Sequence, residues 1–142
     1  MARLRETSSK REFEEIDKVD QKFSKISNEE KCKKILEIDD TIRFAGISTR
    51  DGQILAGQYK PGYAPFFDEL KTEFSVSKQI LFAMENIQGK EKLGQLMYSV
   101  IAYENQKRAT FALDDGVLLV SFDKSGDENK IINKIIYEVG LG

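Results

Sequence analysis

The sequence predicts an α+β domain with five antiparallel β-segments, which one long helix divides into a pair and a trio. The trio lies in the stretch 98–122, where turn-forming residues separate three segments, 98–103, 108–113 and 117–122. These segments are rich in β-branched, aromatic and leucine side chains. Residues 117–120 (VLLV) form a continuous apolar run, which is typical of a central strand covered on both faces.

The pair is an earlier hairpin. Residues 41–48 and 53–59 flank the turn 49–52, in which Asp-Gly supplies the conformationally tolerant corner. Gly46 and Gly57 weaken strand propensity, so we expect a helix or another backbone to come close to them. Alternation along the first strand predicts two faces, with Ile42 and Phe44 on one and Ala45 and Ile47 on the other.

A single long helix is predicted over 66–88, between the pair and the trio. Apolar residues recur there at helical spacing, and Pro65 suits the first turn of a helix. The segment 75–77 can bend this helix but need not break it. The apolar positions are Phe66, Phe67, Leu70, Phe74, Ile80, Leu81, Met84 and Ile87.

Three further helices are predicted outside this framework. A narrow apolar stripe over 9–26 predicts an amphipathic helix that packs either on its own domain or on a second copy. Ser27 and Glu30 form a capping box before a helix over 28–38. The apolar spacing over 131–139 predicts a buried last helix.

Composition restricts the classes of function. The 22 basic and 24 acidic residues leave a net charge of -2, which gives no drive toward nucleic acid or anionic lipid. No apolar run reaches the length of about 18 residues that a membrane-spanning helix needs, and no secretory signal is expected. Cys32 is the one cysteine, so we expect a reducing, cytoplasmic compartment. Lysines flank Cys32, but a small buried hydrophobe is the favoured interpretation.

No motif indicates catalysis, a cofactor or a metal. The absence of histidine excludes Ser-His-Asp and Cys-His sites, and the Gly-rich phosphate loops are missing. The segment 123–128 (DKSGDE) resembles the start of a calcium loop, but Glu128 and Lys134 occupy the positions that require Gly and Glu. A helix cap explains the same residues. The acidic pairs 39–40 and 114–115 fall at turns, and we expect no enzyme.

The order helix, helix, strand, strand, long helix, three strands, helix resembles the roadblock / dynein-light-chain family of the profilin-like group. The matching stretches are ILEIDDTIRFAGISTRDGQILAG at 35–57 and YSVIAYENQKRATFALDDGVLLVSF at 98–122. The resemblance implies a three-layer α/β/α domain over 28–142 and an additional N-terminal extension over 1–27. It also implies the sheet order 2-1-5-4-3, with the long helix on one face and the terminal helices on the other.

The resemblance further implies a non-enzymatic, dimerising adaptor or regulator that acts on a small GTPase or a signalling complex. Members of the family pair through the edge strand nearest the long helix, which corresponds here to about 96–103. The candidate interface residues on that strand are Met97, Tyr98, Val100, Ile101 and Tyr103. Tyr59 and Tyr63 are further candidates for an interface or a binding groove.

A small-molecule sensor resembling PAS domains is the alternative, because it shares the order of strands. Such sensors place several short helices between their second and third strands and keep a cavity against the sheet. The single periodic run 66–88 disfavours this alternative. A helix broken near Ser75 or a closed apolar cavity would favour it.

Overall fold

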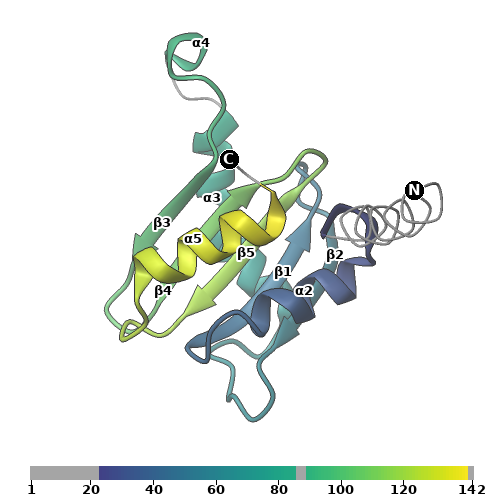
Figure 1. Ribbon diagram of the computed structural model, residues 1–142, viewed down its shortest axis with the longest axis vertical. Coiled ribbons are helices and arrows are strands. Elements are labelled where there is room, and N and C mark those ends of the chain that lie inside the picture. Colours follow the sequence, from purple (N-terminus) through teal and green to yellow (C-terminus); the bar gives the residue numbers. More distant parts are fainter. Residues whose placement is uncertain (1–22, 86–88, 141–142) are drawn as a thin grey trace, which may run out of the picture.

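The predicted hairpin and the three predicted strands form one five-stranded antiparallel sheet in the computed structural model, which describes residues 23–85 and 89–140 (Figure 1). The order is β2-β1-β5-β4-β3, as the resemblance implies. The strands are β1 (Ile42–Ser48), β2 (Ile54–Tyr59), β3 (Tyr98–Ala102), β4 (Lys107–Ala112) and β5 (Val117–Phe122). The helical segments are η1 (Phe23–Lys25), α2 (Asn28–Leu36), α3 (Leu70–Glu85), α4 (Lys90–Leu93) and α5 (Glu128–Val139).

Helices cover both faces of this sheet. In Figure 1, α2 and α5 lie side by side across the near face, and α3 lies behind the sheet. The larger apolar cluster joins α2 and α5 to the near face, and a smaller cluster joins Phe74 of α3 to Phe44 and Leu119 on the other face. Every residue of β5 is buried. The two-sided burial predicted for 117–120 is therefore confirmed.

The helix ends follow their capping residues. Ser27 caps α2 by accepting a hydrogen bond from the backbone N–H of Glu30 at 3.2 Å. Asp127 caps α5 in the same way, with Lys130 as the donor at 3.2 Å. The segment 123–128 thus contains a helix cap, and Arg43 holds the Asp123 carboxylate at 2.5 Å. Gly140 ends α5 in the left-handed conformation, as its position predicts.

Two predicted details differ. The long helix begins at Leu70 instead of residue 66, and Phe66 and Phe67 lie in the loop before it. It is unbroken at Ser75 and continues to Glu85; residues 86–88 lie outside the described part of the chain. The predicted separation of β1 into faces is wrong for Ile42, because the β1–β5 register shifts between Ile42 and Phe44. Ile42 packs in the cluster with α2 and α5, opposite Phe44.

The helix predicted over 9–26 falls mostly outside the described residues. Its described end, Phe23–Lys25, forms the 3-10 turn η1. Phe23 is 4% exposed and belongs to the same apolar cluster as α2 and α5. The division into an extension over 1–27 and a domain over 28–142 stays a prediction.

The close approach predicted at the two strand glycines is found. A Cβ added to Gly46 would lie 2.6 Å from the Phe74 ring, and one added to Gly57 would lie 2.6 Å from a Leu70 methyl group. Both contacted residues belong to α3. Small residues on adjacent strands therefore allow α3 to lie directly on the sheet.

We expect Gly46→Ala to lower the free energy of unfolding by about 1–3 kcal/mol, because the added methyl group overpacks the Phe44–Phe74 contact. Gly57→Ala is the matched control. It should lower the free energy of unfolding by less, because the clashing atom is the end of a half-buried leucine side chain. Urea denaturation of the two variants measures the difference. Equal stability of the two would contradict the packing argument.

Candidate functional site

The outer edge of β3 has no strand beside it among the described residues. The sheet ends at β3, which pairs with β4 alone. The Met97 carbonyl accepts from the N–H of Ala112 at 2.9 Å, and the Tyr103 N–H donates to the carbonyl of Gln106 at 2.8 Å. Hydrogen-bonding direction alternates along an antiparallel strand. The backbone groups of the even-numbered residues, Tyr98, Val100 and Ala102, therefore point outward from the sheet.

The predicted interface residues on this strand are apolar and accessible. Met97 is 42% exposed and Tyr103 46% exposed, and Tyr98 is also exposed. Val100 and Ile101 are half-buried. A bare edge that carries five apolar or aromatic side chains is prone to pair with another strand.

These side chains divide between the two faces of the sheet. Tyr98 stacks on Phe111 at a centroid distance of 5.7 Å, and Val100 packs on the cluster that includes α5. Strand alternation places Met97, Ile101 and Tyr103 on the opposite face, where α3 lies. Both faces of the sheet thus present apolar atoms at this edge.

Tyr59 and Tyr63 form a second group, away from the β3 edge. Tyr59 is the last residue of β2, at the opposite edge of the sheet, and its ring lies 4.9 Å from that of Phe44. The Tyr63 ring follows at 6.3 Å from Tyr59 and at 6.1 Å from Phe66. The Tyr63 hydroxyl accepts from the Gln106 side chain at 3.4 Å. This row of rings holds the loop before α3 against the sheet and carries Phe66 toward β4.

Burial shapes the titration of both hydroxyls. Burial raises the pKa of Tyr59, and the carboxylate of Glu73 raises it further. The pKa of Tyr63 is also raised, mainly by burial. Both phenols therefore remain neutral at physiological pH; Tyr59 serves as a packing group, and the Tyr63 hydroxyl accepts a hydrogen bond.

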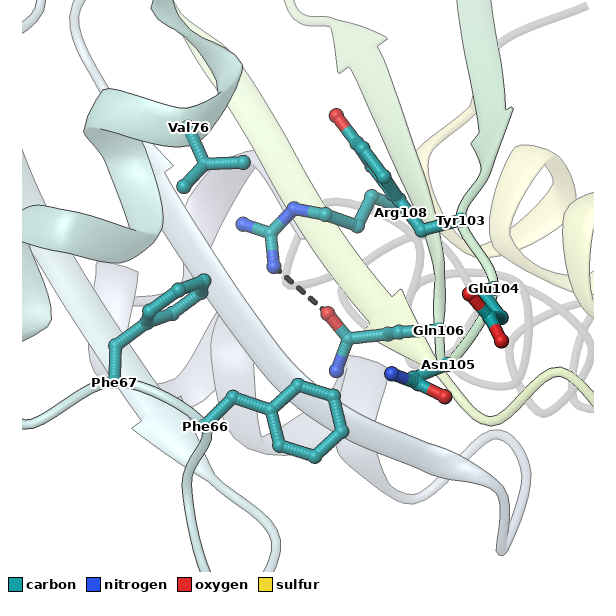
Figure 2. A pocket seen from close by; sticks show the side chains of 8 residues that line it. All are labelled: Phe66, Phe67, Val76, Tyr103, Glu104, Asn105, Gln106 and Arg108. Carbon is teal, nitrogen blue, oxygen red and sulfur yellow. Dashed lines mark hydrogen bonds between the residues drawn. The ribbon is translucent and has the colours of Figure 1, made fainter.

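An open pocket of about 350 Å³ lies where this loop, α3 and the β3–β4 turn meet (Figure 2). Its lining is largely apolar, and the turn residues form one rim. Figure 2 shows the Arg108 side chain reaching across the floor between Val76 and Phe67. The lining residues are Phe66, Phe67, Val76, Tyr103, Glu104, Asn105, Gln106 and Arg108.

A buried ion pair forms the base of the pocket. Arg108 and Glu73 are each 3% exposed, and the Arg108 guanidinium donates to the Glu73 carboxylate at 2.9 Å. It also donates to the Glu73 backbone carbonyl at 2.8 Å and to the Gln106 side chain at 3.0 Å. Sequence reasoning missed this pair, because its members are 35 positions apart and neither belongs to a motif.

The groups considered for chemistry have structural roles. Cys32 is buried, and burial raises the pKa of its thiol to about 12, so the thiol stays protonated. Asp39 accepts hydrogen bonds from the side chain and backbone of Thr41, which lower its pKa. Within residues 23–85 and 89–140, no group of three or more Cys, Asp or Glu side chains is placed to hold a metal ion.

Comparison with known proteins supplies structural relatives. No family model matches the sequence, and no curated protein matches it. Among solved structures, a Roadblock/LC7 domain from Streptomyces avermitilis superposes with a TM-score of 0.62 over 81% of this chain and 93% of that chain, at 8% identity. This chain has a roadblock-like fold.

Two further structures support the same assignment of a roadblock-like fold. The gliding protein MglB from Thermus thermophilus has a TM-score of 0.57 at 20% identity and covers 72% of this chain and 76% of its own. An MglB structure with a tetrameric arrangement has a TM-score of 0.61 at 18% identity over 76% of this chain and 79% of its own. At these identities the likeness establishes the fold alone.

No helix in the described parts of this roadblock-like chain is both long and apolar enough to cross a membrane.

Proposed function

We propose that this roadblock-like protein is a non-enzymatic adaptor that forms a homodimer through the free edge of β3. The observation that carries the proposal is the row of outward-pointing backbone groups at Tyr98, Val100 and Ala102, flanked by apolar side chains. A second β3 in antiparallel orientation would satisfy these groups and extend the sheet across both copies. The solved relative with a tetrameric arrangement is consistent with self-association in this fold.

The length of the edge supports one register for the proposed dimer. A two-fold axis perpendicular to the sheet relates the two strands, keeps α3 on the same side in both copies and makes one residue its own partner. Centring the axis at Val100 pairs Tyr98 with Ala102 of the second copy and uses every outward-pointing group of the strand. We therefore place Val100 on the axis.

The unbroken α3 and the open pocket favour this adaptor over the sensor that resembles PAS domains. We further propose that the dimer acts in the cytoplasm on a small GTPase or another protein of a signalling complex. The near balance of 22 basic and 24 acidic residues supports a protein partner over nucleic acid.

Light scattering coupled to size-exclusion chromatography tests the dimer. At tens of micromolar we expect a mass of twice the 16.2 kDa of one chain. A strict monomer would overturn the proposal. Co-purification from the native host, with the wild-type protein as bait, tests the partner, and we expect a small GTPase among the proteins retained.

A further inference from the structure

The segment before β3 carries large apolar side chains that no other described residue covers. Residues 89–97, which contain α4, project beyond the end of the sheet as an arm between α3 and β3 (Figure 1). Within this arm Leu93 is 71% exposed and Met97 is 42% exposed. Leaving large apolar side chains in water forfeits the stabilisation that burial would bring, so the arm has the character of an interface segment.

The open pocket lies at the opposite end of the same strand. The arm precedes the first residue of β3, Tyr98, whereas the pocket rim begins at Tyr103, just after the last residue, Ala102. Met97 and Tyr103 lie on the α3 face of the sheet by strand alternation. The arm and the pocket thus share a face and an edge but are separated by the length of the strand.

Antiparallel pairing about Val100 brings these two ends together. In that register Met97 of each copy lies directly opposite Tyr103 of the other, and their side chains point to the same face. Residues that precede Met97 then run alongside residues that follow Tyr103. Leu93 of one copy therefore arrives at the pocket of the second copy.

We propose that the arm of each copy packs into the pocket of the other, with Leu93 and Met97 buried against Phe66, Phe67 and Tyr103. This inference rests on the proposed dimer and adds the segment that completes the pocket. The pocket has room for an aliphatic side chain, with a volume of about 350 Å³ and a largely apolar lining. Charge is complementary at the rim, since exposed Lys92 on the arm would approach exposed Glu104 on the turn.

A cysteine pair tests the register. Met97 and Tyr103 would be directly opposite in a pair without mutual hydrogen bonds, at a Cα separation of about 4.5 Å, which suits a disulfide. We expect the Met97→Cys/Tyr103→Cys variant to form a covalent dimer with oxidised glutathione. Each single variant should not, because its two copies of the cysteine would be roughly 20 Å apart. A dimeric protein in which the double variant fails to cross-link would overturn the placement of the arm.

Leu93→Ser tests the burial of the arm. We expect the dissociation constant of the dimer to rise about 10–100-fold, because each dimer would bury two copies of this side chain. Leu55→Ser is the matched control; Leu55 is 39% exposed on β2, at the other edge of the sheet, and the variant should dimerise like the wild type. Leu93 is an exposed residue, so the variant should keep its fold.

Phe66→Ser completes the test from the pocket side. Phe66 is 56% exposed, and the double variant with Leu93→Ser should dimerise little worse than either single variant, since both substitutions remove one contact. Wild-type affinity of Leu93→Ser in a protein that does dimerise through β3 would overturn the arm contact and leave the proposed function standing. A monomeric wild-type protein would overturn both.

Discussion

The Val100→Glu variant is expected to be a monomer at concentrations at which the wild-type protein is a dimer. With the axis at Val100, the two introduced carboxylates would be directly opposite, at a Cα separation of about 5.5 Å. Like charges opposite each other on paired strands repel, and juxtaposed like charges at an interface cost several kcal/mol. We expect the dissociation constant to rise at least 100-fold, measured by sedimentation or by light scattering over a dilution series.

Two companion variants separate loss of pairing from loss of folding. Val100 is half-buried and packs on the cluster that includes α5, so Val100→Glu can also destabilise the monomer. Ala102 is exposed on the same edge. Ala102→Glu should therefore dissociate the dimer without destabilising the monomer. Gln58→Glu adds the same charge at an exposed position on β2 and should leave the dimer intact. A folded, dimeric Ala102→Glu variant would contradict dimerisation through the edge of β3.

The Glu73→Ala variant is expected to lose about 3–5 kcal/mol of the free energy of unfolding. Removing this carboxylate leaves the Arg108 guanidinium buried without a compensating charge, and breaking a buried pair in this way is strongly destabilising. The Arg108 Nε is already buried without a hydrogen-bond partner. Few other groups near Arg108 can therefore accept a hydrogen bond from its guanidinium. Urea denaturation followed by circular dichroism measures the change.

Removing both charges should lower the free energy of unfolding much less than removing Glu73 alone. In Glu73→Ala/Arg108→Met no buried charge remains, and we expect at least half of the lost stability to return. Glu69→Ala is the matched control, because Glu69 makes an exposed ion pair with Lys71 and such pairs contribute at most about 1 kcal/mol. If Glu73→Ala and Glu69→Ala unfold at the same urea concentration, the buried pair does not stabilise the packing of α3 on β4.

Several features of this protein follow from local sequence alone. The continuous apolar run 117–120 predicted a strand covered on both faces, and β5 is buried throughout. Ser27 and Glu30 predicted the start of α2, and the glycines at 46 and 57 predicted the close approach of a helix or another backbone. Each of these signals depends on residues that are neighbours in the chain, or on the period with which side chains reach one face.

Tertiary contacts make α3 start later than the local sequence predicts. Helical spacing and Pro65 predicted a start near residue 66, but Phe66 lies against Tyr63, and the Phe67 ring lies 5.9 Å from the Arg108 guanidinium. These partners belong to the loop and to β4. Their contacts hold the two phenylalanines in the loop, so α3 begins at Leu70.

The sequence by itself determined the order of the five strands and of α2, α3 and α5, the caps of α2 and α5, and the apolar residues of 97–103. Only the tertiary structure decided that Glu73 meets Arg108, that Ile42 and Phe44 lie on opposite faces, and that a pocket adjoins the β3 edge. The physical reason is that period and capping are encoded between near neighbours. Contacts across 35 positions instead depend on strand register and on how a helix crosses the sheet, and no local pattern specifies these.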